Sequence, residues 1–175
     1  MKRKALAITL AAVMAMGTCA VTASAADGDK YTIGICQLVQ HDALDAATQG
    51  FKDEVIKELG EDAVTFDEQN AQGDSNTCST IVNSFVSNNV DLILANATPA
   101  LQAAAAGTSD IPILGTSVTE YGVALGLDDF DGTVGGNISG TADLAPLDEQ
   151  AAMLQELFPD AKNVGLLYCS AEANS

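Results

Sequence analysis

Short runs of apolar and β-branched residues alternate along the chain with segments in which apolar residues recur every three or four positions. This alternation is typical of strands and amphipathic helices that follow one another in sequence. The runs predict strands at residues 31–35, 64–66, 91–95, 111–115 and 164–168. The periodic segments predict helices over residues 44–59, from 74 or 75 to 85, over 100–106 and over 147–157. A glycine-rich passage at 122–140 predicts a turn-rich crossing before the last helix.

The order of these elements predicts the fold class. Strands that alternate with helices join through right-handed crossovers into an α/β, doubly wound parallel sheet. The nearly continuous apolar run at 91–95 fits a strand whose two faces are both covered by helices. Ligands of such sheets bind beyond the carboxyl ends of the strands. A ligand site is therefore expected among residues 37–41, 69–71, 96–98 and 116–119.

Thr98 and Pro99 follow the third predicted strand and are typical of a helix N-terminus. Thr98 fits the N-cap position, and Pro99 fits the first helical position, where a missing N–H costs nothing. The free amides of such a helix start bind anions such as a carboxylate without any basic side chain. An ordinary cap that binds no ligand fits the same two residues.

Three other side chains are candidates for ligand contacts, each with a structural alternative. Asp143 and Glu172 could receive a ligand ammonium group, or they are surface acids; Asp143 could also begin the next helix. His41 either lines the ligand site or caps the helix that follows the first strand, and as the only histidine it predicts no metal site. The acidic stretch 128–132 lacks the distal glutamate of a calcium loop and predicts a solvated turn.

Sequence motifs of the common enzyme classes are absent. The chain has no G-x-S-x-G elbow, no phosphate-binding P-loop and no H-E-x-x-H motif. No two of the four cysteines are spaced as C-x-x-C, so the spacing supports no zinc site. We therefore predict no catalytic residue, no metal and no cofactor.

The first 25 residues are typical of an export signal. A basic head at 2–4 precedes an apolar run at 5–16 and small residues up to 23–25. Cleavage after 23–25 would release an exported protein, whereas a lipid on Cys19 would anchor it to a membrane; both remain open. We expect a periplasmic or cell-surface location in either case.

The charge balance of the remaining chain excludes some partners. Residues 26–175 keep four basic residues against 24 acidic ones, which repel nucleic acids and anionic lipid surfaces. The same residues keep Cys36, Cys78 and Cys169, an odd number that leaves at least one thiol unpaired within the chain. We expect no disulfide framework, because a domain of this size buries a core without one.

Six segments, taken in order, resemble the TrpX-like ABC-transporter substrate-binding proteins. They are the residues 31–35, 37–47, 69–74, 97–100, 136–140 and 172–175. The resemblance implies two lobes of the periplasmic-binding-protein type I fold that are joined by a hinge. Residues 26–136 would form the first lobe, and 137–175 the hinge crossing and the beginning of a second, similar lobe. Because no helix follows the last predicted strand, we expect an N-terminal fragment.

The resemblance also implies a set of residues in or near the ligand cleft. By position they are Gln40, His41, Asn70, Thr98, Ala100, Thr116, Ser117, Thr119, Thr141, Asp143, Glu172, Asn174 and Ser175. The chain departs from the family pattern at Gln40, where relatives commonly have Glu, at Asp42, where they have Pro, and at 169–171, where they have Asn-Pro-Gly. The missing acid at position 40 leaves the partner of the ligand ammonium group open.

The family is associated with tryptophan and other aromatic amino acids. We therefore expect the solute-binding component of an ABC importer, which closes two lobes on a small zwitterion and delivers it to permease and ATPase subunits. A sugar- or nucleoside-binding protein of the same fold is an alternative, although the chain has no Trp to stack on such ligands. A secreted flavodoxin-like enzyme is another, and it would show colour or turnover.

Overall fold

The computed structural model describes residues 30–174 of the chain. The predicted export signal, Cys19 and the predicted ligand residue Ser175 lie outside the described residues. Within residues 30–174, one five-stranded sheet has the order β2-β1-β3-β4-β5, and every neighbouring pair is parallel. Its strands are β1 (Tyr31–Gln37), β2 (Val64–Asn70), β3 (Leu92–Asn96), β4 (Ile113–Val118) and β5 (Ile138–Ala142). The prediction of an α/β, doubly wound parallel sheet is confirmed.

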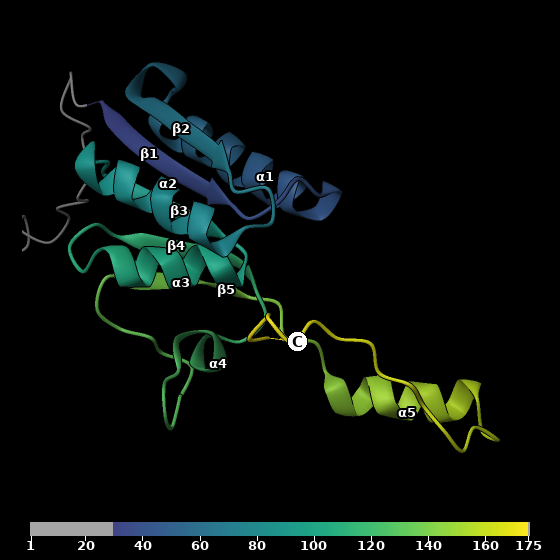
Figure 1. Ribbon diagram of the computed structural model, residues 1–175. Helices are drawn as coiled ribbons and strands as arrows, with labels where there is room; N and C mark the ends of the chain where they lie inside the picture. Colours follow the sequence, from purple (N-terminus) through teal and green to yellow (C-terminus); the bar gives the residue numbers. More distant parts are fainter. Residues whose placement is uncertain (1–29, 175) are drawn as a thin grey trace, which may run out of the picture.

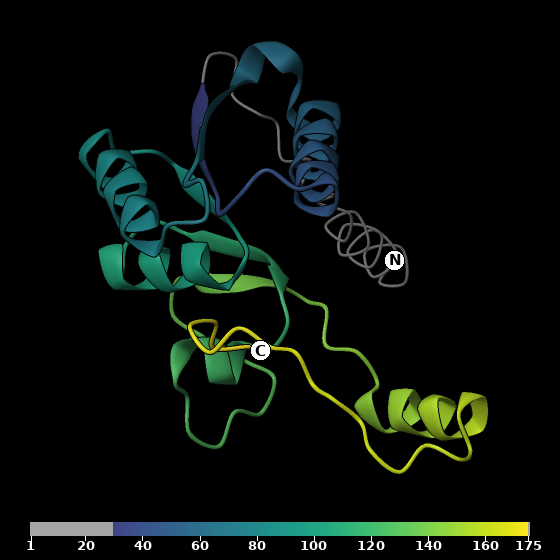
Figure 2. The same cartoon turned by 45° about the vertical axis from the view of Figure 1, so that its right-hand side comes forward.

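Helices cover both faces of this sheet (Figure 1). Helices α2 (Ser75–Ser87) and α3 (Thr98–Gly107) lie side by side on one face, and α1 (Asp42–Leu59) lies on the other. The short η1 (Glu61–Ala63) leads into β2, and α4 (Tyr121–Leu125) follows β4. Helix α5 (Leu147–Leu157) stands apart from the sheet in both Figure 1 and Figure 2.

Each face has its own hydrophobic core. The larger core lies under α2 and α3 and includes the fully buried Phe85, Leu101 and Ile93. The smaller core packs Ile35 and Leu94 of the central strands against apolar residues of α1. Together the two cores hold β1 and β3 at the centre of the sheet, which fixes where their carboxyl ends lie.

Close packing of α2 on β1 predicts that Gly34→Ala will be destabilising. A Cβ at Gly34 would lie 2.7 Å from the Phe85 ring, closer than real Cβ atoms approach. Overpacking of this kind lowers the free energy of unfolding by about 1–3 kcal/mol, which urea unfolding will measure. The control is Gly50→Ala on α1, where nothing lies within 4 Å. That variant should be neutral or slightly stabilising, because alanine favours a helix interior; equal losses in both variants would contradict the packing argument.

The first four predicted strands and the predicted helices are confirmed, with ends that shift by a few residues. The glycine-rich passage holds an unpredicted strand, β5, which pairs with β4 and carries the sheet beyond the predicted lobe boundary at residue 136. The strand predicted at 164–168 is wrong. Within residues 30–174 no strand lies beside this segment, and Leu166 is 87% exposed. An isolated apolar run stays irregular when it has no strand with which to form hydrogen bonds.

The helix ends follow local sequence signals. The Oδ1 atom of Asp74 accepts a hydrogen bond from the Thr77 amide at 2.7 Å and caps α2, at the helix start predicted near 74 or 75. Gly60 ends α1 with a φ of 91°, a conformation that glycine adopts readily. Among the described helices, none has both the length and the apolar content to cross a membrane.

Candidate functional site

The carboxyl ends of the strands lie at one edge of the sheet, because all the strands are parallel. Beyond β1 and β2 this edge has a polar hollow of about 360 Å³. Its lining is Gln37, Gln40, Asp45, Glu68, Gln69 and Asn70. The structure therefore brings together two predicted ligand residues that are 30 positions apart in sequence, Gln40 after β1 and Asn70 at the end of β2.

His41 and Asn70 both hold backbone turns at this edge. The Nδ1 atom of His41 accepts a hydrogen bond from the Ala43 amide at 3.2 Å and caps α1. The Asn70 Oδ1 atom accepts one from the Gln72 amide at 2.8 Å. Both side chains are exposed. Of the two interpretations offered for His41, the structure supports the helix cap.

The start of α3 differs from the prediction. Thr98 is the first residue of the helix rather than its N-cap, and the N-cap is Ala97, which makes no side-chain hydrogen bond. The Thr98 side chain is only 4% exposed, and the Ala100 side chain is fully buried in the core. Ala100 can therefore offer a ligand only its backbone amide. First-turn amides have no intrahelical acceptor, so the amides of Thr98 and Ala100 are available donors at this end.

Ala97 has an unusual backbone conformation at this point. Its φ is 87° and its ψ is 159°, in a region that is essentially reserved for glycine. The Ala97 amide donates to the Thr116 carbonyl at 3.0 Å, which ties the strained residue to β4. Strain of this kind persists where the surrounding structure over-determines it, and such positions cluster at functional sites.

Ala97→Gly is expected to stabilise the protein by about 1 kcal/mol, because glycine removes strain that exceeds its entropic cost. The matched control is Ala106→Gly, an exposed position of the same helix. There the substitution should cost about 1 kcal/mol, since glycine is a poor helix former. Chemical unfolding of the two variants should therefore give changes of opposite sign; a loss of stability at both positions would argue against strain at Ala97.

The segment that ends the described chain contacts the start of α3. The Asn174 Nδ2 atom donates a hydrogen bond to the Thr98 Oγ1 atom at 3.0 Å, across 76 positions of sequence. The Asn174 amide donates to the Glu172 Oε1 atom at 3.3 Å. Asn174 thus connects a helix N-terminus, which favours negative charge, to a carboxylate, which favours positive charge. Three predicted ligand residues meet at this point.

The remaining predicted residues lie in the last parts of β4 and β5 or just after these strands. Thr116 and Thr141 line an apolar hollow of about 430 Å³ beside α1. Thr119 lines a larger hollow of about 540 Å³ on the other side of β5. Ser117 has a φ of 55°, at a bulge where the pairing of β4 with β5 shifts. Thr116, Thr119 and Thr141 therefore lie along two separate hollows rather than in a single pocket.

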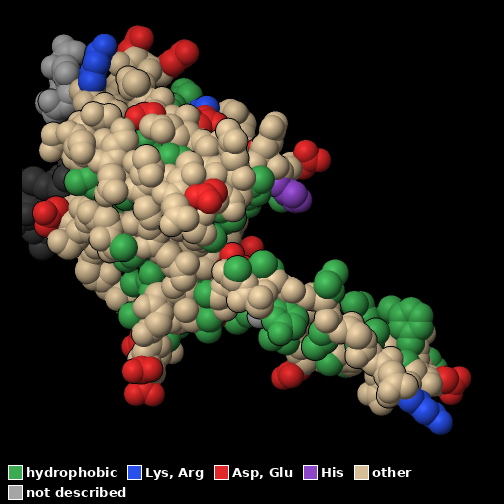
Figure 3. All heavy atoms as spheres, viewed as in Figure 1, with side chains coloured by type: hydrophobic (Ala, Val, Ile, Leu, Met, Phe, Trp, Pro, Cys, Tyr) green, Lys and Arg blue, Asp and Glu red, His purple; other side chains and the backbone are tan. Residues whose placement is uncertain are grey.

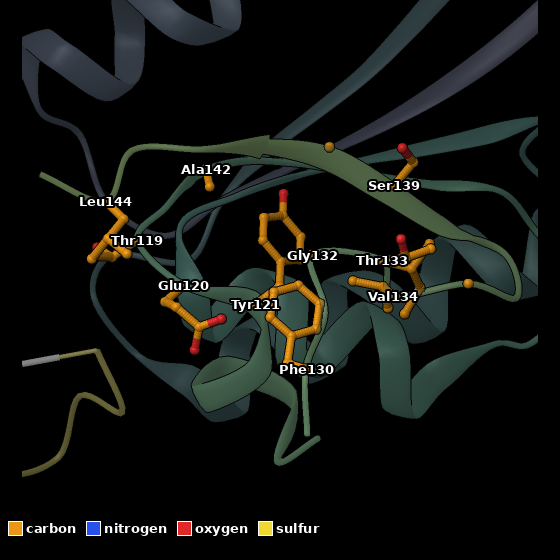
Figure 4. Close-up of a pocket in the computed structure, with 13 residues that line it drawn as sticks. Thr119, Glu120, Tyr121, Phe130, Gly132, Thr133, Val134, Ser139, Ala142 and Leu144 are labelled. Carbon is orange, nitrogen blue, oxygen red and sulfur yellow. The ribbon is translucent and has the colours of Figure 1, made fainter. Parts of the chain in front are cut away.

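The larger hollow is shaped by aromatic residues (Figure 4). The Tyr121 ring points from α4 toward β5 with the Phe130 ring beside it, and its hydroxyl donates to the Thr141 carbonyl at 3.2 Å. A Cβ at Gly115 or Gly140 would overlap that hydroxyl. Burial, together with the nearby Asp143 charge, raises the pKa of Tyr121. Asp143 itself is exposed, and its amide donates to the Val118 carbonyl at 3.1 Å.

A buried polar network under the strand ends was not predicted. The fully buried Asn96 donates from Nδ2 to the Leu44 carbonyl at 2.8 Å and to Thr48 Oγ1 at 2.9 Å. Thr48 in turn donates to Gln37 Oε1 at 2.7 Å, and Gln37 Nε2 donates to Asp45. The network joins β1, β3 and α1 directly beneath the polar hollow. In the sequence, the sign of this network was a polar residue, Asn96, at the end of an otherwise apolar strand.

The described residues hold no evident metal site. Among residues 30–174, no three His, Cys, Asp or Glu side chains lie close enough together to bind a metal ion. The described groups at the strand ends are amides, hydroxyls and separated carboxylates. Such groups bind a polar solute through hydrogen bonds and charge.

Comparison with known proteins relates this geometry to a family. A tyrosine-binding protein of Clostridioides difficile (strain R20291) is 43% identical over 149 residues, which cover 82% of this chain and 42% of the relative. A substrate-binding protein with adhesive properties from Clostridium difficile, solved in a ligand-free, open form, is 42% identical with a TM-score of 0.66. It is matched over 82% of this chain and 49% of its own.

A Streptococcus pneumoniae ABC domain in complex with L-Trp has a TM-score of 0.77 and 33% identity, over 83% of this chain and 50% of that chain. The chain thus spans about half the length of the relatives that it matches. The family model described as ABC transporter substrate binding protein matches residues 32–175. This match extends over nearly all of the described residues, and it agrees with the resemblance inferred from the sequence. The chain belongs to the ABC transporter substrate-binding protein family.

Proposed function

We propose that this chain is part of the extracytoplasmic solute-binding component of an ABC importer, which captures an aromatic amino acid without altering it. The observation that carries the proposal is the contact of Asn174 with both Thr98 and Glu172. The contact brings the start of α3, where the helix dipole favours a negative group, close to a carboxylate, which favours a positive group; a zwitterionic ligand carries both groups. Permease and ATPase subunits would be its partners, and the export signal predicted at residues 1–25 would direct it out of the cytoplasm.

The ligand carboxylate would bind at the start of α3. The amides of Thr98 and Ala100 are the donors there, and Pro99 contributes none because it lacks an N–H. The positive end of the helix dipole favours a negative group at this position. This arrangement suits a chain with few basic residues, since it binds an anion with backbone groups alone.

The ligand ammonium group would bind Glu172. Sequence reasoning left Asp143 and Glu172 as equal candidates, and two observations favour Glu172. It is half-buried, whereas Asp143 is exposed. It is also joined through Asn174 to the start of α3. Its side chain therefore lies on the same side of the site as the backbone amides that would bind the ligand carboxylate.

Two-lobe closure is part of the proposal. The chain spans about half the length of its solved relatives, so a second lobe would be built mainly from residues beyond 174. Residues 137–175 would contain the crossing and the beginning of that lobe. In support, hydrophobic side chains gather on α5 and the segment after it (Figure 3). Exposed residues in this region include Leu147, Leu157, Phe158, Leu166 and Leu167, and surfaces of this kind normally pack against other protein.

The ligand class rests on the relatives. One relative is named for tyrosine, and another was solved with L-Trp. Both are aromatic amino acids that share the carboxylate and ammonium groups for which the site at Thr98 and Glu172 is suited. Closure on such a ligand would shift the population from open to closed lobes, by as much as the ligand prefers the closed form.

Thermal-shift measurements on the full-length protein test this function. L-tyrosine, L-tryptophan or L-phenylalanine should raise the melting temperature by several degrees, because ligands that bind only the folded state stabilise it. N-acetyl-L-tyrosine, without an ammonium group, and tyramine, without a carboxylate, are matched controls and should have little effect. Stabilisation by sugars or nucleosides alone would favour the alternative binding protein. Turnover of any ligand would refute binding without chemistry.

A further inference from the structure

Two cysteines that lie 42 positions apart in sequence meet in the larger core. Cys36 belongs to β1 and Cys78 to α2, and both side chains are fully buried. Each thiol is the largest influence on the pKa of the other, so the two side chains lie next to each other in this core. The third cysteine of the described chain, Cys169, is exposed and lies in the segment after α5.

The packing of α2 on β1 explains why Cys36 and Cys78 lie close together. Gly34 lies directly against Phe85, which brings the helix close to the strand. Cys36 is two residues beyond Gly34 and therefore on the same face of the strand. Cys78 is seven residues before Phe85, so it lies two turns away on the same face of α2. Because α2 runs back along β1, these two offsets place Cys36 and Cys78 over the same part of the interface between the strand and the helix.

Neither sulfur serves the proposed ligand site. Neither Cys36 nor Cys78 lines any of the three hollows at the strand ends. Close thiol pairs of this kind become disulfides in oxidising compartments, whereas the cytoplasm keeps them reduced. We infer that Cys36 and Cys78 form a disulfide that fastens α2 to β1 once the protein is exported, an inference that rests on the export proposed above.

The bond would form by thiol–disulfide exchange with an oxidised dithiol oxidoreductase or a small disulfide such as oxidised glutathione. The Cys78 thiolate attacks one sulfur of this partner and releases the other as a thiol. The Cys36 thiolate then attacks the Cys78 sulfur of the mixed disulfide and releases the second thiol. The two cysteines are oxidised, the partner is reduced by two electrons, and the two protons pass to the released thiols.

Cys78 suits the role of the attacking sulfur. The hydrogen bond from Cys36 lowers the pKa of Cys78, whereas its bond to Cys78 and its burial raise the pKa of Cys36. The thiolate is the nucleophile in thiol chemistry, so a lowered pKa favours Cys78 as the attacking sulfur. Because both sulfurs are buried, exchange takes place while the chain folds or when α2 opens locally.

The disulfide would act on the ligand edge of the sheet. Cys36 is next to Gln37, and the loop that the bond closes contains α1, β2 and Asn70. Cross-linking a loop of this length removes conformational freedom from the unfolded chain. The oxidised protein should therefore melt at least about 5 °C higher than the reduced protein.

Refolding of the full chain from urea in a glutathione redox buffer tests the inference. Digestion with a glutamate-specific protease separates the two cysteines, since Glu54, Glu58, Glu61 and Glu68 lie between them. Mass spectrometry should then find one cross-linked peptide pair containing Cys36 and Cys78, lighter by two hydrogens than the reduced pair. The Cys169→Ser variant should form the same pair, and Cys78→Ala should not.

Three outcomes would overturn the inference: alkylation of both thiols after refolding, a disulfide that involves Cys169, or glutathione that remains attached to Cys78. Each can be read from the wild-type protein, so the result does not depend on whether a variant folds. Ligand binding is measured separately by thermal shift. A protein that binds an aromatic amino acid without this disulfide would refute only the disulfide. A protein that forms the disulfide but binds no aromatic amino acid would refute only the proposed ligand.

Discussion

Replacing Asn96 with aspartate should lower the free energy of unfolding by about 3–5 kcal/mol at neutral pH, the cost of a buried charge without a partner. The side chain is fully buried, and its Nδ2 atom donates to the Leu44 carbonyl and to Thr48. Aspartate has the same shape but places an acceptor where the donor stood. Its oxygen would face the Leu44 carbonyl, with the Asp45 carboxylate held nearby by Gln37.

The loss should depend on pH in a defined direction. Burial and the surrounding acceptors raise the pKa of the new carboxyl group in the folded state above its unfolded value. The folded variant then binds more protons than the unfolded chain, so its stability falls as pH rises from the unfolded pKa through the folded pKa. Below the unfolded pKa the acid is protonated in both states and can donate to Leu44, which restores most of the stability.

Urea unfolding of the wild type and Asn96→Asp at about pH 4.5 and about pH 8 measures both effects. The matched control is Asn83→Asp on the exposed face of α2, which makes the same substitution where water solvates the charge. That variant should change stability little. A loss below about 1 kcal/mol for Asn96→Asp, or a loss of equal size at both pH values, would contradict the proposed network.

The same network marks a limit of reasoning from sequence. The apolar run that ends at Asn96 predicted β3 correctly, because a strand covered on both faces has a local signature. The partners of Asn96 come from β1 and α1, more than 45 positions earlier. Nothing in the local pattern indicates which distant side chains will satisfy a buried amide, so the network was visible only in the structure.

Two elements were predicted incorrectly for one physical reason. Residues 138–142 form β5 although Ile138 is their only large apolar residue, since an edge strand with exposed side chains needs little hydrophobicity. Residues 164–168 are strongly apolar and are not a strand. An apolar run indicates that a segment is stabilised by burial, whereas a strand also needs a neighbouring strand with which its backbone can form hydrogen bonds. In the proposed two-lobe protein, this run would pack against the second lobe.

The candidate ligand residues were predicted in part because topology fixes where parallel strands end. Gln40 and Asn70 meet as a result. The contact of Asn174 with Thr98 could not come from topology, since it depends on how the chain returns after α5. Charge alone made Glu172 a candidate beside Asp143, and only the family resemblance pointed to Asn174. The structure adds which groups these residues touch, and so which of the two candidate acids to test.

Glu172→Gln should weaken the binding of L-tyrosine or L-tryptophan by the full-length protein about 10- to 150-fold, as expected for a lost hydrogen bond to a charged group. Glutamine keeps the size of the side chain and the Oε1 acceptor that holds the Asn174 amide. The contact with Thr98 should therefore persist. What disappears is the negative charge that would pair with the ligand ammonium group. Isothermal titration calorimetry measures the change in Kd.

Asp143→Asn is the matched control, because it removes the charge of the other candidate acid. Its side chain is exposed, and its amide keeps the bond to Val118, so binding should change less than about threefold, as for an exposed charge pair.

A ligand without the ammonium group distinguishes a charge effect of Glu172 from an effect on the shape of the site. 3-(4-Hydroxyphenyl)propionate should bind wild type and Glu172→Gln with equal, weak affinity if Glu172 acts on the ammonium group alone. A larger loss of amino-acid affinity from Asp143→Asn than from Glu172→Gln would place the ammonium site at the end of β5. If Glu172→Gln also weakened the binding of the propionate ligand, Glu172 would shape the site rather than pair with a charge.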